Sequence, residues 1–262
     1  MLAELDKDGS NAGLLADLLK LCTIVQDPDQ DRLRDKSDDL YVQPLNVWPI
    51  RLLSVIEAHD KLTRCALFEY LDMVIVAFHC NRSTINSRKS SFIELGPDKA
   101  RGVLTAGLHR WRHIHERLRH VIRSVTLGDD AKRLILTGHG TGGVLACLEA
   151  AYLATASPSR QLTVVTFGAP KFSGRNFANV YRSLGIATYR IVNRFDPVPR
   201  YPFWFPRIHH VPSTVYHLYD GGLHRAPATR RFDFILPGRV DDHRTVEYEA
   251  AMRSWMKAIH RS

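Results

Sequence analysis

The amino-acid sequence predicts an α/β protein with a mostly parallel central sheet and helices on both faces. Between residues 133 and 192, apolar runs alternate with segments of helical apolar spacing. Runs such as LILT and LTVVTF are apolar almost throughout, which is typical of strands buried on both faces. Strands that alternate with helices form parallel sheets, because each helix carries the chain back to the same edge.

The N-terminal part of the chain predicts one helix and little other regular structure. Residues 14–24 have apolar residues at helical spacing. Residues 27–39 mix both charge signs and contain almost no apolar residue, so we expect an exposed loop there. Residues 50–56 predict a short helix or a turn.

Two apolar runs, at residues 65–70 and 73–79, are separated by Leu71 and Asp72. This spacing predicts a hairpin that leads into a buried strand. The next stretch, residues 82–99, is polar and contains Ser, Asn, Gly and Pro, so we expect a loop that could cover a site.

The helix that follows is amphipathic and strongly basic. Its apolar positions recur at helical spacing at Leu108, Trp111, Ile114 (or His115), Leu118 and Ile122. Its other face carries Arg110, Arg112, Arg117, Arg119 and Arg123. Such a helix can lie on an anionic membrane, but a helix packed on a sheet with a basic outer face has the same pattern. We favour the packed helix.

In the second half of the chain, strands and helices follow one another regularly. We expect strands at residues 133–137, 162–167 and 187–192, and helices at residues 142–155, 175–184 and 240–259. Ligands of such sheets bind at the carboxyl ends of the parallel strands, so we expect a functional site in the loops there.

Length and composition indicate one folded domain over residues 1–262, in which residues 1–45 contribute a helix and a charged loop. The chain is 45% hydrophobic and 24% charged, which is typical of folded proteins. Its apolar runs are too short to span a bilayer, and we recognise no signal peptide in the first thirty residues. The four cysteines are widely spaced without a CxxC motif, so we expect free buried thiols and a cytoplasmic location.

The most informative segment is RLILTGHGTGGVLACLEAAYLA, residues 133–154. A predicted strand leads into a glycine-dense turn and directly into a helix. Where a G-x-S-x-G turn occupies this place, its serine is a nucleophile held in a strained backbone conformation. Small flanking residues allow the turn to close, and the N-terminus of the helix adds backbone N–H donors.

Here the chain resembles the class 3 lipases, the α/β-hydrolase family of fungal triacylglycerol lipases. The family's turn reads G-H-S-x-G-G, and this chain has GHGTGG at residues 138–143. Four further segments resemble the family in order, namely VTFGAPKFSGRNFA, YRIVNRFDPVPR, VYHLYDGG and DDHRTVEY. The resemblance covers residues 65–250 and implies an α/β-hydrolase fold with lipid or carboxylic-ester hydrolysis.

The resemblance also implies a catalytic triad at position 140, Asp196 and His243, in the nucleophile–acid–histidine order of α/β-hydrolases. Asp196 follows a predicted strand and precedes Pro197, so we expect its carboxylate at a strand end. There it would fix the tautomer of His243 and stabilise the imidazolium. Taken singly, Asp196 is an ordinary loop acid and His243 is one of thirteen histidines, but their joint placement favours the site.

The nucleophile position departs from the family, because it is occupied by Gly140, which cannot form an acyl-enzyme. Thr141 is the nearest hydroxyl, but one residue along a tight turn changes the side-chain direction. The resemblance implies that Thr141 gives its backbone N–H to the oxyanion hole. The family's F-R-G-[ST] strand end, whose last residue donates to the oxyanion, reads FHCN at residues 78–81. Asn81 can donate through its amide. Cys80 could replace the nucleophile, or it could simply be a small residue at a strand end.

An aromatic segment, RYPFWFPRIHH at residues 200–210, follows Asp196 closely. Its aromatic side chains could line an acyl groove or contact lipid, or they could pack over the sheet edge. These residues are Tyr201, Phe203, Trp204 and Phe205.

The histidines show no metal-binding pattern. His209 and His210 are adjacent and therefore point apart, without an acid or a cysteine at ligand spacing. His113 and His115 are unpaired in the sequence. We expect no metal and no cofactor.

Three functions fit these observations. The first is a lipase-like protein whose hydrolytic activity is impaired because Gly140 occupies the nucleophile position. Such a protein would bind an acyl lipid, an ester ligand or an unknown protein partner. The second is an active carboxylic-ester hydrolase that uses Asp196 and His243 with a restored or surrogate nucleophile. The third is a nucleic-acid binder, because the net charge is +9 and 27 of the 36 basic residues are arginines. No nucleic-acid-binding motif supports this function, so we do not expect the protein to bind nucleic acid. An anionic membrane surface is a partner that fits the positive net charge.

Overall fold

The computed structural model describes residues 11–26, 41–42, 50–59, 61–81, 92–95, 100–126, 132–202, 207–226 and 239–260. The loop expected at residues 27–39, and most of the one expected at residues 82–99, lie outside these ranges. Residues Phe92–Leu95 are described and form a strand, so the loop expected there is wrong, because residues 100–104 supply backbone partners for this strand.

The strands of the main sheet are β1 (Tyr41–Val42), β2 (Ile50–Glu57), β3 (Thr63–Tyr70), β4 (Met73–Cys80), β7 (Arg133–His139), β8 (Leu162–Phe167), β9 (Ala187–Asn193), β10 (Thr214–Tyr219) and β11 (Gly222–Arg225). A separate hairpin consists of β5 (Phe92–Leu95) and β6 (Ala100–Leu104). Among the described residues, the helices are α1 (Ala12–Gln26), α3 (Thr105–Val125), α4 (Thr141–Ala156), α5 (Arg175–Ser183) and α6 (Thr245–Ile259). The described 3-10 turns include η2 (Val198–Arg200) and η4 (Val240–His243).

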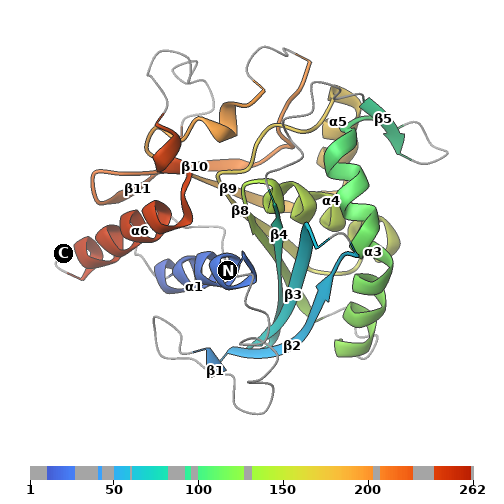
Figure 1. The fold of residues 1–262 in the computed structure, drawn as a ribbon, viewed down its shortest axis with the longest axis horizontal. Coiled ribbons are helices and arrows are strands. Elements are labelled where there is room, and N and C mark those ends of the chain that lie inside the picture. Colours follow the sequence, from blue (N-terminus) through green and yellow to red (C-terminus); the bar gives the residue numbers. More distant parts are fainter. Residues whose placement is uncertain are drawn as a thin grey trace.

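Five neighbouring strands at the centre of the sheet, β4, β7, β8, β9 and β10, run parallel, which confirms the expected α/β class (Figure 1). β3 and β4 form the predicted hairpin, with Tyr70 opposite Met73. The antiparallel pairs lie toward the two edges, where β1, β2 and β3 extend one side and β11 the other. The carboxyl ends of the parallel strands therefore meet at one edge, where ligands of such sheets bind.

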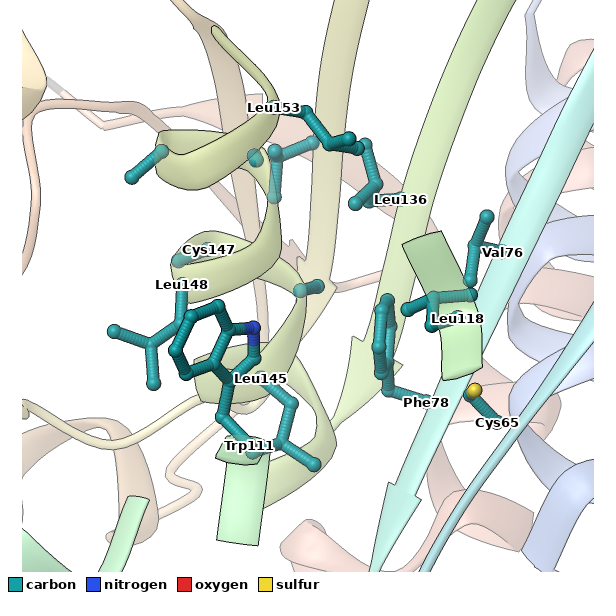
Figure 2. Packing of buried hydrophobic residues seen from close by; sticks show 14 of the residues in the cluster. Cys65, Val76, Phe78, Trp111, Leu118, Leu136, Leu145, Cys147, Leu148 and Leu153 are labelled. Carbon is teal, nitrogen blue, oxygen red and sulfur yellow. The ribbon is translucent and has the colours of Figure 1, made fainter. Parts of the chain in front are cut away.

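Helices cover both faces of the sheet, with α3 and α4 on one face and α1 and α6 on the other (Figure 1). The apolar side of α3 is buried at Leu108, Trp111, Ile114, Leu118 and Ile122. Figure 2 shows Trp111 and Leu118 in the same buried cluster as Phe78 of β4 and Leu145 of α4. Because the protein's own core fills this side, the packed-helix interpretation of α3 is confirmed.

Residues 50–56 form strand β2, so the predicted short helix or turn is wrong. β2 pairs antiparallel with β3, beginning with Ile50 opposite Tyr70. A run this short does not separate helix from strand by its periodicity. The neighbouring strand decides the outcome, since it supplies partners for the backbone groups.

The helix predicted at residues 240–259 is interrupted near its start. Residues Val240–His243 form the turn η4, Arg244 is extended with φ −69° and ψ 142°, and α6 begins only at Thr245. The interruption places His243 outside the regular helix. The apolar pattern also does not predict β10, which continues the parallel sheet beyond β9.

All four cysteines, Cys22, Cys65, Cys80 and Cys147, are free and buried, as expected. Burial raises the pKa of the thiols of Cys22 and Cys147 to about 12, so both stay protonated. In the described part of the chain, no helix has the length and apolar character needed to cross a membrane.

Candidate active site

Gly140 lies in the turn between β7 and α4, as the sequence predicts. Strand β7 ends at His139, and α4 begins at Thr141. The backbone of Gly140 has φ +56° and ψ −125°, a conformation that residues with a side chain rarely adopt. Its N–H donates to the carbonyl of Phe167 at the end of β8, 2.8 Å away, which fixes the turn against the neighbouring strand.

The flanking glycines are needed because backbones approach closely. A Cβ atom on Gly138 would lie 2.3 Å from the backbone of Gly142. A Cβ atom on Gly142 would lie 2.2 Å from the carbonyl oxygen of Phe78 in β4. Contacts this short do not occur between real atoms, so a larger residue at either position would push α4 away from the sheet.

The two other predicted triad positions form a buried pair. Nδ1 of His243 lies 2.8 Å from Oδ2 of Asp196, and both side chains are almost wholly buried. The same Oδ2 accepts a hydrogen bond from the hydroxyl of Tyr248 at 2.7 Å, and Oδ1 accepts one from the backbone N–H of Val198 at 2.9 Å. Three donors therefore hold one carboxylate, and hydrogen bonds to a charged acceptor are the strong ones.

Tyr248 is a site residue that the sequence reasoning does not single out. Burial, together with the neighbouring carboxylate of Asp196, raises the pKa of Tyr248 well above its ordinary value. The hydroxyl therefore keeps its proton and keeps donating to Asp196. The family's D-H-x-x-Y segment contains the signal, but here the tyrosine lies two residues farther from His243 than in that spacing.

The loop that carries Asp196 is tied to the turn that carries His243. The side-chain amide of Asn193 donates to the carbonyl of Asp242 at 3.0 Å. The buried carboxylate of Asp242 accepts a hydrogen bond from the backbone N–H of Phe195 at 3.2 Å. These two hydrogen bonds hold together segments that are distant in the chain, and they fix the distance between the acid and the histidine.

Gly140 lies directly against the Asp196–His243 pair. A Cβ atom on Gly140 would lie 3.1 Å from Nε2 of His243. The ring of His139 packs beside that of His243, with ring centroids 4.5 Å apart. Gly168, with φ +63°, leaves room for the pair, because a Cβ atom there would lie 2.7 Å from Oδ2 of Asp196. The fold thus brings together the three positions that the resemblance implies.

The two oxyanion candidates lie at a helix start and a strand end. Thr141 is the first residue of α4, where backbone donors have no intrahelical acceptor. Asn81 follows β4 and is exposed, but its backbone N–H donates to the carbonyl of Leu62, 2.8 Å away. The backbone N–H of Asn81 is thus already used, and its side-chain amide is the donor that could bind an oxyanion. Cys80 is buried, with its sulfur 3.9 Å from the hydroxyl of Thr63.

The expected acyl groove is described only at its first residue. Tyr201 is partly buried, and its carbonyl accepts a hydrogen bond from the backbone N–H of Lys171 at 2.9 Å. Phe203, Trp204 and Phe205 lie outside the described residues.

The expectation that His113 and His115 are unpaired is wrong, because Nε2 of His113 lies 3.2 Å from Nδ1 of His109, and His115 has a buried partner. Its Nδ1 lies 3.0 Å from Oε2 of Glu149, a fully buried carboxylate that also accepts the indole N–H of Trp111 at 2.7 Å. This cluster joins α3 to α4, a contact between distant segments that sequence spacing does not reveal. Within the described ranges, no three His, Cys, Asp or Glu side chains gather in a way that could hold a metal.

A parallel sheet that presents a tight glycine turn and an aspartate–histidine pair at its strand ends places the protein among the α/β-hydrolases. Within that class, the chain belongs to the class 3 lipases. The family model Lipase (class 3) matches residues 73–205, about half of the chain.

Two curated relatives show the same relationship over a shorter stretch. "Secreted mono- and diacylglycerol lipase 1" of Fusarium solani is 30% identical over 101 residues, which is 38% of this chain and 30% of that protein. "Phospholipase A(1) DAD1, chloroplastic" of Arabidopsis thaliana is 30% identical over 100 residues, or 37% and 22% of the two chains. The matched stretch is therefore less than a third of either relative.

Solved structures agree with the fold over nearly the whole length. Lipase II from Rhizopus niveus superposes with a TM-score of 0.76 at 18% identity, covering 91% of this chain and 94% of that one. The triacylglyceride lipase of Rhizomucor miehei superposes with a TM-score of 0.75 at 16% identity, with the same two coverages. At these identities the likeness concerns the fold alone.

Proposed function

We propose that this protein is a lipase-like member of its family that binds an acyl lipid or ester ligand but hydrolyses it poorly. One observation carries the proposal: the position that faces Nε2 of His243 is Gly140. Ester hydrolysis through an acyl-enzyme needs a hydroxyl or thiol at that position. Removing the nucleophile from another serine hydrolase lowers turnover by about a millionfold.

The rest of the site supports a role in ligand binding. The Asp196–His243 pair retains its hydrogen bonds, and α4 presents its N-terminus toward the turn. The curated relatives are named as acylglycerol and phospholipid hydrolases. An acyl lipid or carboxylic ester is therefore the ligand class we assign to the site.

The second candidate is an active hydrolase with a surrogate nucleophile. Thr141 and Cys80 are the residues with a suitable group, but neither occupies the position that approaches Nε2 of His243. Cys80 is buried and contacts Thr63, and Thr141 lies one residue into α4. These placements favour the impaired protein.

The experiment is a stopped-flow assay with p-nitrophenyl butyrate, combined with fluorophosphonate labelling detected by mass spectrometry. We expect no burst of p-nitrophenol and no label, whereas a fluorescent fatty-acid analogue binds saturably. A burst equivalent to one site per chain would overturn the proposal. Its loss in Thr141→Ala would then identify the threonine as the nucleophile, and its loss in Cys80→Ala the thiol. Intact-mass measurement of protein from its natural source would show whether Gly140 is native there.

The cytoplasmic location and the anionic membrane surface remain proposals. The free, buried cysteines support a reducing compartment. The exposed arginines of α3, such as Arg112 and Arg123, support attraction to anionic lipid. A nucleic-acid function would require saturable binding at near-physiological salt, and we expect none in a salt-titrated assay with duplex DNA or single-stranded RNA.

A further inference from the structure

The Asp196–His243 pair has the orientation of a general base. Because Nδ1 of His243 faces the carboxylate of Asp196 at 2.8 Å, the neutral ring carries its proton on Nδ1. The lone pair is then on Nε2, the atom that a Cβ on Gly140 would approach to 3.1 Å. The basic nitrogen therefore faces the backbone position from which a nucleophilic side chain would project.

The histidine is held in this orientation by several independent contacts. The hydroxyl of Tyr248 donates to Asp196, and the ring of His139 packs beside that of His243. Asn193 and Asp242 fix the loop and the turn that carry the pair. A base with this much support is pre-organised, which is what proton transfer in a reaction requires.

We propose that a small free nucleophile, water or a short alcohol, takes the place of the serine side chain and attacks a bound ester directly, with His243 as the general base. The inference rests on the proposed function, because it assumes that Gly140 marks the nucleophile position and that an ester is the ligand. The acyl group is transferred only once, directly to the free nucleophile, and no acyl-enzyme forms.

With methanol as the nucleophile, the methanol oxygen forms a bond to the ester carbonyl carbon while its proton moves to Nε2 of His243. The carbonyl π electrons move to the carbonyl oxygen, which becomes the oxyanion. When the tetrahedral intermediate collapses, the oxyanion electrons re-form the carbonyl, the bond to the leaving alkoxide breaks, and that alkoxide takes the proton from Nε2. The products are the methyl ester and the released alcohol. With water, the products are the carboxylic acid and the alcohol.

A free nucleophile avoids two constraints that a side chain at position 140 must meet. A side chain on Gly140 must start from a Cβ that already crowds Nε2 at 3.1 Å and must accept φ +56°. A water or methanol molecule has no covalent attachment to residue 140, so the backbone does not fix its distance from Nε2. What the free molecule lacks is the effective concentration of a tethered group, which reaches about 10⁵–10⁸ M in good intramolecular systems. Turnover is therefore slow but dependent on His243.

The test measures p-nitrophenol release from p-nitrophenyl butyrate by the full-length protein, with methanol as the added probe. We expect a burst-free rate that rises linearly with methanol concentration from the rate in water alone, together with methyl butyrate detected by gas chromatography–mass spectrometry. General-base catalysis contributes about 10²–10⁴-fold, so His243→Gln lowers the enzymatic rate at least about 100-fold. His120→Gln, a matched change at an exposed histidine of α3, leaves the rate unchanged.

Gly140→Ala provides a second test if His243→Gln fails to fold, as judged by its thermal melting. The added methyl group occupies the space beside Nε2 without supplying a hydroxyl, so both hydrolysis and methanolysis should fall. A rate that is insensitive to methanol, or that survives both His243→Gln and Gly140→Ala, overturns the inference.

The failure of this inference can be told apart from failure of the proposed function. If the fatty-acid analogue binds and no burst is seen, but no His243-dependent turnover is found, the direct attack is wrong and the proposed function stands. If a burst and a fluorophosphonate label appear, a protein nucleophile exists, and both proposals fail together.

Discussion

Gly140 and His243 lie so close together that a Cβ atom on the glycine would come within 3.1 Å of Nε2 of the histidine. Contacts this short are rare for real Cβ atoms, so a side chain at position 140 requires the imidazole to move by a few tenths of an ångström. The position of the His243 ring therefore leaves too little space for a side chain at position 140. A serine at position 140 must displace the ring slightly and also adopt a backbone conformation that is strained for a residue with a side chain.

Gly140→Ser should lower the free energy of unfolding by about 1–3 kcal/mol, because φ +56° is strained for a residue with a side chain. It should also gain fluorophosphonate labelling and some esterase activity, since an Oγ is now beside His243. Urea unfolding and labelling measure the two effects. Gly140→Ala is the control, because it carries the same strain without the hydroxyl.

The extent of recovery in Gly140→Ser is itself informative. Full activity would mean that only the nucleophile is missing. Weak activity would point to Asn81, whose backbone N–H is already bonded to Leu62, as a second defect. An unchanged stability with no labelling at all would contradict the assignment of residue 140 to a strained turn that faces the histidine.

Tyr248→Phe should destabilise the protein by about 1.5–3 kcal/mol, the usual contribution of a hydrogen bond to a charged group. The hydroxyl that it removes donates to Oδ2 of Asp196 at 2.7 Å. In the Gly140→Ser background, the change should lower the rate of labelling, because Asp196 then holds His243 less firmly. Tyr219→Phe, at an exposed tyrosine, is the control and should alter neither quantity. Equal effects of the two changes would exclude a positioning role for Tyr248.

Gly168→Ala should cost more stability than its backbone angle explains. A left-handed residue with a side chain costs about 1–2 kcal/mol, and both Gly168 (φ +63°) and Gly185 (φ +65°) have this conformation. A Cβ on Gly168 would also lie 2.7 Å from Asp196, whereas nothing lies within 4 Å of one on Gly185. We therefore expect Gly185→Ala to lose only the backbone part, as measured by chemical denaturation. Equal losses would mean that the pair moves aside without resistance.

Asp17→Asn should make stability less dependent on pH. Asp17 belongs to α1, and its burial raises the pKa of its carboxyl to about 6. The hydroxyl of Tyr70, 3.5 Å from Oδ2 of Asp17, has the smaller and opposite effect on this pKa. Since the unfolded carboxyl titrates near pH 4, the native state binds the extra proton between about pH 4 and pH 6. The stability that this group contributes is present below pH 4 and is lost as pH rises to about 6.

We therefore expect Asp17→Asn to be more stable than the unmodified protein above pH 6, with the difference vanishing below pH 4. Thermal melting across pH 3.5–7.5 measures it. Asp241→Asn, at an exposed carboxylate, is the control and should follow the unmodified curve. A difference that is constant across the range would mean that Asp17 is not titrating in the folded protein.

Much of the sheet could be predicted from the sequence, because a strand that is buried on both faces is a continuous apolar run. The strands β7 and β8 are apolar almost throughout, and the spacing of Leu108 to Ile122 records the buried side of α3. The glycine turn is local in the same sense. Close contact between strand and helix excludes every other residue at Gly138 and Gly142.

The remaining errors concern segments whose form depends on a neighbour. Strand β2 is a strand because β3 supplies its backbone partners, and the run itself is too short to show a period. The pairing of His115 with Glu149 joins two helices whose sequence spacing gives no sign of contact.

The family, the glycine at position 140 and the order of the acid and the histidine can all be read from the chain, because each is a matter of residue identity and order. Whether these residues meet is a matter of distance between remote segments. The tertiary structure decides it through Asn193, Asp242 and Tyr248, whose hydrogen bonds hold Asp196 and His243 together. These bonds join segments that are distant in the chain, so no local pattern of the sequence records them.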